Sequence, residues 1–180
     1  MKILALDPSL SSTGYAIIDD KKNLIAKGKI NTDKKYSTDD RIQEILLTFD
    51  RNTLFDDIKY VILEDGFVGK NIKGSLSLAQ LRGALIAFFK YRNCYVTHSQ
   101  PKQIRSNFGL SGAAKKEEVA EKVLEYYPNL INEIGPYSDK ANKNKTSDIY
   151  DAISIGLSYI INVGDIDEWA RRKTHRILWF

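Results

Sequence analysis

"MKILALDPSLSSTG", residues 1–14, contains the feature that decides the fold. Residues 2–7 are mostly apolar and predict a buried strand. That strand ends on a carboxylate, Asp7, and a proline with several small hydroxyl residues follows at once. A strand end that needed only a turn could carry almost any polar residue. An acid at this point indicates a functional site only if other acids of the chain lie beside it.

The segments that follow predict an antiparallel meander. Residues 13–19 predict a second strand, and the turn "DKKN" leads into a third strand at residues 24–30. Apolar residues at spacings of three and four then predict an amphipathic helix over residues 38–55, with a serine or threonine as its N-cap. A short β-branched run at residues 59–65 predicts a central strand, which again ends in acids.

The second half of the chain predicts alternating helices and strands. The predicted elements are a long apolar helix at 75–91, a strand at 94–98, a short helix at 101–108, a helix at 115–127 and a last core helix from Ser147 to 163. A polar, lysine-rich stretch from 128 to 145 predicts a mobile loop. A meander, a helix and then this alternation predict an α/β fold, a mixed five-stranded sheet with helices on both faces.

Composition narrows the class of protein. A chain of 180 residues with 43% apolar residues is long enough to bury the core of a single domain. No apolar run approaches the roughly 20 residues that cross a bilayer, and Asp7 interrupts the one apolar stretch at the start, so we expect a cytoplasmic protein without membrane contact. The single cysteine, Cys94, cannot form an intramolecular disulfide and is expected to pack at a strand start. A net charge of +4 favours acidic partners.

Three further acids fall where they could meet Asp7. Glu64 ends the predicted strand at 59–65, so it shares a sheet edge with Asp7 if the two strands are parallel neighbours. Asp148 and Asp151 are three residues apart at the start of the last helix and share one helical face. Converging carboxylates repel unless a cation lies among them, and hard oxygen ligands suit Mg²⁺ or Mn²⁺. Two such ions, roughly 4 Å apart, can activate water and hold a phosphodiester in line for cleavage.

Each acid alone also has a structural explanation. Asp148 near a helix N-terminus complements the helix dipole, and Glu64 with the following Asp-Gly could form only a turn. The two histidines, His98 and His175, are expected to be structural because neither falls within the acidic motifs. Only the set of four acids indicates a catalytic site.

Several stretches of the chain resemble one protein family. They are "LDPSLSSTGYAII", "ILEDGFVGKN", "LAQLRGAL", "PKQIRSNFGLSGAAKKEEV" and "SDIYDAISIGL". In order and spacing they resemble the RuvC-type Holliday junction resolvases of bacteria and phages, within the ribonuclease H-like superfamily. The resemblance implies a ribonuclease H-like nuclease domain, taken as residues 1–163. It leaves residues 164–180 as a basic, aromatic C-terminal extension without an assigned role.

The resemblance implies an activity and its cofactor. The chain would be a metal-dependent endodeoxyribonuclease that resolves four-way branched DNA by paired symmetric nicks. Two Mg²⁺ ions per site, which Mn²⁺ could replace, would be held by four catalytic acids: Asp7, Glu64, Asp148 and Asp151. The resemblance does not indicate whether a branch-migration partner is needed.

The resemblance also implies which residues contact DNA. Lys116 would be the catalytic basic residue that approaches the scissile phosphate, although the adjacent Lys115 could take that place. Lys102 in "PKQ" would be a second contact, and Lys115 would contact DNA if it does not face the phosphate. Phe67 would stack on unpaired bases at the crossover. The chain departs from the family pattern at Ser9, where glycine is usual, and in the lysine-rich loop before the last helix, which is expected to contact DNA.

A homodimer is also predicted. A four-way junction is resolved by two symmetric nicks, so two active sites related by a two-fold axis would match the substrate. The apolar residues of the helix at 75–91 exceed what one buried stripe needs, and Gly83, Ala84 and Ala87 would let a partner helix approach closely. The alternative is a helix buried wholly within one subunit.

Three other functions fit parts of the sequence. An actin-like sugar kinase or ATPase also begins with a strand that ends in aspartate, but it needs about twice this length and a second glycine-rich phosphate loop, which the chain lacks. A structural DNA-binding member of the same fold would have lost an acid, and all four are present. A ribonuclease H-like nuclease acting on other branched DNA or on RNA would differ only in substrate geometry. Phe67 and the "AQLRG" stretch favour junctions.

Overall fold

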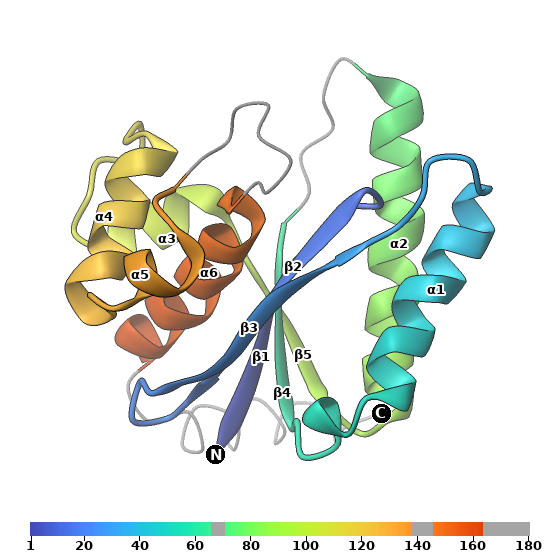
Figure 1. Cartoon of the computed structure of the whole chain (residues 1–180), viewed down its shortest axis with the longest axis horizontal. Helices are drawn as coiled ribbons and strands as arrows, with labels where there is room; N and C mark the ends of the chain where they lie inside the picture. Colours follow the sequence, from blue (N-terminus) through green and yellow to red (C-terminus); the bar gives the residue numbers. More distant parts are fainter. Residues whose placement is uncertain (66–70, 138–145, 164–180) are drawn as a thin grey trace, which may run out of the picture.

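One mixed sheet of five strands organises the molecule (Figure 1). The computed structural model describes residues 1–65, 71–137 and 146–163. The strands are β1 (Lys2–Asp7), β2 (Ser12–Asp19), β3 (Leu24–Asn31), β4 (Tyr60–Glu64) and β5 (Tyr95–Ser99). Their order across the sheet is β3-β2-β1-β4-β5. β1, β2 and β3 form the predicted antiparallel meander, whereas β4 pairs in parallel with β1 and β5 in parallel with β4.

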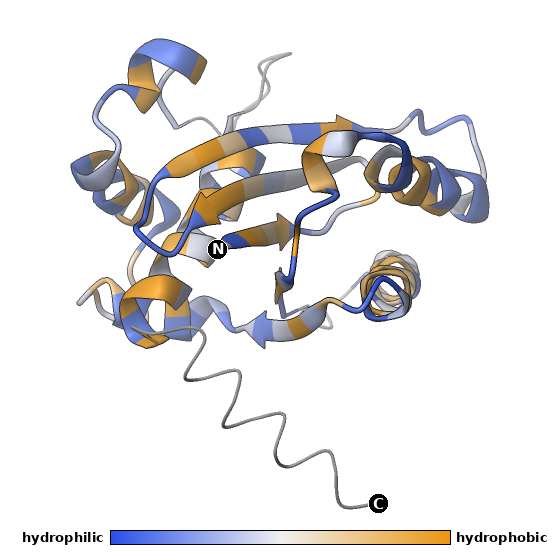
Figure 2. Ribbon diagram, turned by 90° about the horizontal axis from the view of Figure 1, so that it is seen from below, coloured by the Kyte–Doolittle hydropathy of each residue, from blue (hydrophilic) through white to orange (hydrophobic). Residues whose placement is uncertain are grey.

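Helices cover both faces of the sheet (Figures 1 and 2). On one face lie α1 (Thr38–Arg51) and α2 (Ile72–Tyr91), which share a core with the sheet. The opposite face is covered by α3 (Pro101–Asn107), α4 (Lys116–Tyr126) and α6 (Ser147–Val163). Between α4 and α6 the chain forms the short helix α5 (Leu130–Ile134). The predicted α/β fold with two covered faces is therefore confirmed.

Strand β1 is buried on both faces because both faces are covered. Ile3 and Ala5 point into the core shared with α6, while Leu4 and Leu6 point into the core shared with α1 and α2. All four side chains are fully buried. This double burial explains why the first strand reads as a continuous apolar run, and it leaves Asp7 as the first residue at the sheet edge.

Two predicted helix boundaries were wrong. The helix predicted over 38–55 ends at Arg51, because the side chain of Asn52 accepts a hydrogen bond from the Leu54 backbone and starts a separate 3-10 helix, η1 (Thr53–Phe55). The helix predicted from residue 75 begins three residues earlier, because Asn71 caps it through the Gly74 backbone. In both places an asparagine side chain sets the boundary.

The stretch predicted as a loop from 128 to 145 also contains ordered structure. Helix α5 lies within it, and Leu130 from this helix is buried in the core beneath α4 and α6. The remaining part of that prediction, residues 138–145, lies outside the described residues. The two prolines flanking the segment indicated a break in structure but gave no sign of the single turn of helix between them.

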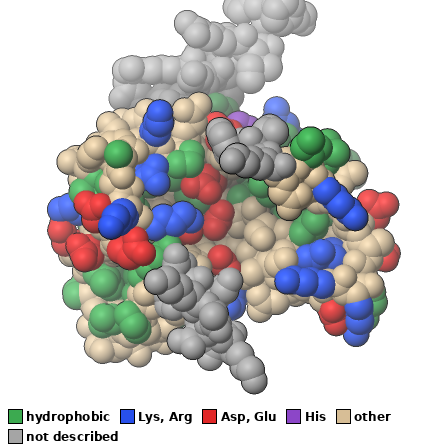
Figure 3. All heavy atoms as spheres, turned by 90° about the horizontal axis from the view of Figure 1, so that it is seen from above, with side chains coloured by type: hydrophobic (Ala, Val, Ile, Leu, Met, Phe, Trp, Pro, Cys, Tyr) green, Lys and Arg blue, Asp and Glu red, His purple; other side chains and the backbone are tan. Residues whose placement is uncertain are grey.

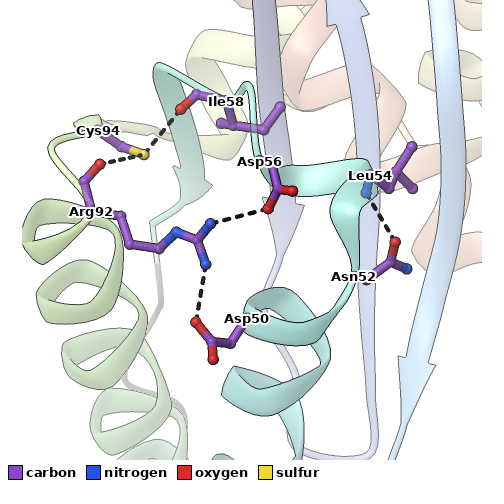
Figure 4. Close-up of polar contacts among 7 residues, drawn as sticks. All are labelled: Asp50, Asn52, Leu54, Asp56, Ile58, Arg92 and Cys94. Atoms are coloured by element: carbon purple, nitrogen blue, oxygen red, sulfur yellow. Dashed lines mark hydrogen bonds and ion pairs between the residues drawn. The ribbon is translucent and has the colours of Figure 1, made fainter.

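Polar contacts connect the C-terminal ends of α1 and α2 (Figure 4). Arg92, which ends α2, forms ion pairs with Asp50 at 3.1 Å and with Asp56 at 3.4 Å. Cys94 is buried directly before β5, and its thiol donates a hydrogen bond to the carbonyl of Ile58 at 3.2 Å. The cysteine therefore has the packing role that its position predicted.

Within the described residues, no helix is both long and apolar enough to cross a membrane.

Candidate active site

Asp7 and Glu64 lie side by side at one edge of the sheet. β1 and β4 are parallel neighbours in which Leu6 pairs with Leu63, so the next residue of each strand is the acid. Both side chains line a hollow of about 320 Å³ together with Asp151. Seen from above, acidic side chains gather at the centre of this face, with Lys and Arg side chains on both sides (Figure 3). The predicted convergence of the two strand-end acids is confirmed.

The remaining two acids come from the N-terminal part of α6, with Asp148 in its first turn and Asp151 three residues later. Asp151 lines the hollow and is only 13% exposed. Asp148 does not line it, but its negative charge is close enough to contribute to the rise in the pKa values of Asp7 and Asp151. The structure thus brings three acids together at one point and places Asp148 beside them.

Gly14 allows α6 to approach the sheet at this point. It pairs with Asp7 across β1 and β2. A Cβ atom at Gly14 would lie 1.9 Å from the backbone oxygen of Asp148 and 2.6 Å from its carbonyl carbon. Only glycine permits so close an approach of a helix backbone to a strand. Sequence reasoning did not identify Gly14, although a glycine inside a predicted strand is the expected signal of such a contact.

The acids perturb one another because they are buried and close together. Burial raises the pKa of Asp7 well above its ordinary value, and the neighbouring charges of Glu64 and Asp151 raise it further. Burial also raises the pKa values of Glu64 and Asp151, against the opposing charge of Lys116. A cluster of this kind is unfavourable without a compensating cation.

Lys116 supplies positive charge to the cluster. Its ammonium group donates a hydrogen bond to Asp151 and forms an ion pair with it. Burial lowers the pKa of Lys116, but the charge and hydrogen bond of Asp151 together with the charge of Asp7 outweigh this effect and raise the pKa above the ordinary value. The side chain is 53% exposed, so it can also reach a ligand in solution. Lys115, in contrast, is the N-cap residue of α4, and its side chain does not line the hollow. Lys116 is therefore the lysine that faces the acids, and its approach to the scissile phosphate stays a prediction.

Arg105 is a site residue that sequence reasoning missed. Lys102 was the predicted contact on α3, but it is exposed and does not line the acidic hollow. Arg105, one helical turn later, does line it. The Nε atom of Arg105 is buried without a hydrogen-bond partner among the described residues. The i, i+3 spacing within "PKQIR" was the available signal, since residues three apart are neighbours on one face of a helix. Phe67 lies outside the described residues.

A second network fixes the end of β4. Arg82 on α2 donates a hydrogen bond to the backbone carbonyl of Glu64 and forms a 2.9 Å ion pair with Asp65. His98 on β5 lies beside both, with its Nδ1 atom 3.3 Å from the Arg82 guanidinium and 3.6 Å from Asp65. Arg82 therefore holds the backbone that carries Glu64. The "LRG" part of the long helix, which carried part of the family resemblance, contributes this residue.

The sequence matches one family model over almost its whole described length. Residues 3–158 match the model described as crossover junction endodeoxyribonuclease RuvC. The chain belongs to this family. The enzyme class predicted from the sequence, an endonuclease, is thereby confirmed.

Curated RuvC proteins cover the chain nearly end to end. RuvC from Prochlorococcus marinus subsp. pastoris is 32% identical over 168 residues, which cover 91% of this chain and 99% of that protein. RuvC from Helicobacter pylori strain 26695 is 34% identical over 166 residues, covering 88% of this chain and 96% of that protein.

Solved structures share the fold. The structure titled "T. thermophilus RuvC in complex with Holliday junction substrate" superposes with a TM-score of 0.66 at 18% identity, covering 89% of this chain and 93% of that one. The Holliday junction resolvase of fowlpox virus has a TM-score of 0.57 at 22% identity, covering 91% of this chain and 99% of that one. These similarities confirm the ribonuclease H-like architecture.

The donor set fits hard divalent cations. RuvC proteins are metal-dependent nucleases, and carboxylate oxygens are the ligands that such ions prefer. Among the described residues, no three His, Cys, Asp or Glu side chains already form a closed ligand group. Lys116 instead provides the counter-charge through Asp151. A divalent cation carries more charge than Lys116. It would stabilise the ionised form of these buried acids, which raise one another's pKa values.

Proposed function

We propose that this chain is a divalent-metal-dependent endodeoxyribonuclease that resolves four-way DNA junctions. One observation carries the proposal: the strand-end acids Asp7 and Glu64 meet Asp151 and Lys116 in one hollow of a chain that belongs to the RuvC family. Two Mg²⁺ ions, for which Mn²⁺ could substitute, would supply Lewis acidity and an activated water. The residues that would hold them are Asp7, Glu64, Asp148 and Asp151.

The protein's own cations would bind and orient the phosphodiester. The ammonium of Lys116 is held at the acids by Asp151 and remains half exposed, so it can move its hydrogen bonds to a phosphate oxygen as negative charge develops there. Arg105 has a buried Nε atom that faces the same hollow, and a guanidinium can donate two parallel hydrogen bonds to a phosphate. Lys102 and Lys115 are exposed on the same helical layer and would contact the strand farther from the cut. Phe67 keeps its proposed role of stacking on an unpaired base.

A ranking of substrates tests this function. The purified protein is incubated with Mg²⁺ and equal amounts of labelled four-way junction, three-way junction, flap, linear duplex and RNA–DNA hybrid. We expect cleavage of the four-way junction to be fastest and to require the metal ion. Preferential cleavage of the hybrid, or equal cleavage of the junction and the linear duplex, would contradict the proposal and favour another ribonuclease H-like nuclease.

A homodimer built on α2 belongs to the same proposal. One stripe of this helix packs on the core through Leu81, Leu85 and Phe89, which the dimer prediction had partly assigned to the interface. The opposite stripe is exposed and consists of apolar or small residues spaced three or four apart: Ile72, Leu76, Ala79, Gly83 and Ala87. Ile72 is 70% exposed and Leu76 is 62% exposed. A second copy of this helix is a suitable partner, because small residues permit close approach and a two-fold dimer would match the symmetry of the junction.

Gly83→Glu is expected to separate the dimer without harming the subunit. A Cβ atom at Gly83 meets no atom within 4 Å, so a side chain fits there in the isolated protomer. Replacing glycine within an exposed helix should also stabilise that helix by roughly 0.5 kcal/mol. We expect sedimentation to show a monomer with an unchanged or higher melting temperature. On a four-way junction, this monomer should cut one strand without coupling to the second cut.

The matched control is Asn132→Glu, which adds the same charge on exposed α5, on the other face of the sheet. It should leave the oligomeric state unchanged. A Gly83→Glu variant that remains a dimer, or a wild-type protein that is monomeric and still cuts both strands in concert, would exclude the α2 interface.

A further inference from the structure

A second hollow adjoins the acidic one and differs from it in charge. It has a volume of about 660 Å³ and is walled by the turn after β1, the connection from β3 to α1 and the first turn of α2. Pro8 and Leu78 line both hollows. The second hollow therefore begins where the site of Asp7 ends. A DNA strand whose phosphate lies at the acids must continue over this surface in one of its two directions.

Three cations and no acidic residue line this second hollow. They are Lys34, Arg41 and Lys73, and we call the site the Arg41 hollow. None of the three forms an ion pair with another described residue, in contrast to Lys116 in the neighbouring site. The charge of Arg41 acts on Asp33 without forming an ion pair with it. Positive charge that is not engaged in ion pairs and that lines a concave surface attracts an anionic ligand.

Arg41 is held in a fixed position by neutral groups. Its Nε atom donates a hydrogen bond to the hydroxyl of Thr32 at 2.8 Å, and one terminal nitrogen donates to the hydroxyl of Ser11 at 3.3 Å. These contacts orient the guanidinium but leave its charge and its other N–H groups available. A planar guanidinium presented in this way suits a phosphate.

The start of α2 adds to the positive potential. Asn71, Lys73 and Gly74 of its first turn line the hollow. The first turn of α2 contains no acidic residue, so no carboxylate there compensates the positive end of this 20-residue helix, which only the neutral Asn71 side chain caps. The serine hydroxyls of residues 9, 11, 37 and 77 complete a lining that is largely polar. Hydroxyls and lysines of this kind are typical of contacts with the sugar-phosphate backbone, which fix register without reading base sequence.

We propose that the Arg41 hollow binds backbone phosphates of the DNA on the side of the scissile phosphate opposite Lys116. Lys116 and Arg105 belong to the layer of α3, α4 and α6, whereas the Arg41 hollow lies at the layer of α1 and α2. Cations on both sides of the acids bind the DNA strand where it crosses the sheet edge. This arrangement determines which phosphate of the DNA lies at the acids. The inference rests on the proposed function, because it takes the acidic hollow as the site of cleavage.

The test compares two pairs of lysines that differ only in location. Lys34→Ala/Lys73→Ala removes two exposed cations of the hollow that form no ion pair with another described residue, so the fold should be unaffected. The control, Lys21→Ala/Lys59→Ala, removes two exposed lysines at the opposite end of the sheet. Binding of a labelled four-way junction is measured without divalent metal over a range of salt concentrations. Each lost phosphate contact should reduce the slope of log affinity against log salt by about 0.9.

The expected result is a slope reduced by about 2 in the hollow variant and unchanged in the control, with affinity lower by roughly tenfold per contact at 0.1 M salt. Equal slopes in the two variants would overturn the inference. The same comparison can be made on any DNA that the wild-type protein binds. A wild-type protein that fails to prefer junctions therefore contradicts the proposed function, while the slopes still decide whether the hollow binds phosphate.

A second experiment identifies the phosphates. Single phosphates near the cut are replaced in turn by neutral methylphosphonates, in the cleaved strand and in the neighbouring strand of the junction. At the phosphate bound by the hollow, neutralisation should weaken binding by the wild-type protein but not by Arg41→Gln. If no position shows this dependence on Arg41, the hollow does not hold a defined phosphate. The strand in which the dependence appears shows which strand of the junction the hollow binds.

Discussion

Asp7→Asn is expected to reduce junction cleavage roughly a thousandfold while leaving junction binding within about twofold of the wild type. Asp7 is the most central acid of the site, since the charges of Glu64, Asp151 and Asp148 all act on it. Removing one anion would weaken the proposed metal site but would leave in place the cations that are proposed to contact DNA. Cleavage is measured in single-turnover experiments with Mg²⁺, and binding is measured on the same junction without metal.

The same substitution should stabilise the metal-free protein. Burial raises the pKa of Asp7, so between its ordinary pKa and the raised value the folded state binds more protons than the unfolded state. Stability of the wild type therefore falls as the pH rises through this window, and asparagine removes that loss. We expect thermal unfolding in a chelator to show a gain on the order of 1 kcal/mol at neutral pH and a smaller gain in acid.

Two outcomes would contradict the role assigned to Asp7. Full cleavage by Asp7→Asn in Mg²⁺ would exclude it as a metal-binding acid. A variant that unfolds at a lower temperature and loses junction binding in parallel with cleavage would indicate that Asp7 has a folding role instead. Asp57→Asn is the matched control, because that aspartate is exposed and its contact with Lys2 lies at the far end of the sheet.

Gly14→Ala is expected to have the second large effect. The added Cβ would lie 1.9 Å from the backbone oxygen of Asp148, and a backbone contact cannot be relieved by rotating a side chain. The start of α6 must therefore move away from the sheet and carry Asp148 and Asp151 with it. We expect a loss of roughly 3 kcal/mol in the free energy of unfolding and a loss of about a hundredfold in cleavage by the folded protein.

Gly156→Ala separates these two effects. It lies on the same helix against the same sheet, but a Cβ there would meet side-chain atoms of Ala5 and Ile18 at 3.0 and 3.1 Å. This variant should lose stability and keep its cleavage rate when assayed well below its melting temperature. A Gly14→Ala protein that is as stable and as active as the wild type would show that α6 does not depend on this contact.

The fold could be predicted from the sequence because its main signals are local. The apolar runs of β1 and β4 and the turn between β2 and β3 indicate the strands, whereas the parallel pairing of β1 with β4 was only assumed in the sequence-based prediction of the site. The errors lie where one side chain changes the backbone path. Asn52 stops α1 by accepting a backbone hydrogen bond, and no periodicity reports such a contact.

The site was predictable to the extent that residue type and sequence order define it. Asp7, Glu64 and Asp151 meet as expected, and the choice between Lys115 and Lys116 needed the orientation of α4. Arg105 was not identified for a similar reason, since the face that α3 turns towards the acids depends on how this helix packs against α6. The roles of Gly14 and Arg82 involve backbone contacts between distant segments.

Mapping the cuts in a four-way junction with a fixed crossover tests the central claim most directly. Each of the four strands is labelled in turn, and the products are resolved at single-nucleotide resolution with Mg²⁺ and with a chelator. We expect one nick in each of two opposite strands, at symmetric positions, only with Mg²⁺ and not with the Asp7→Asn protein. Cuts that are confined to the linear arms, or that persist in the chelator or in the Asp7→Asn protein, would contradict it.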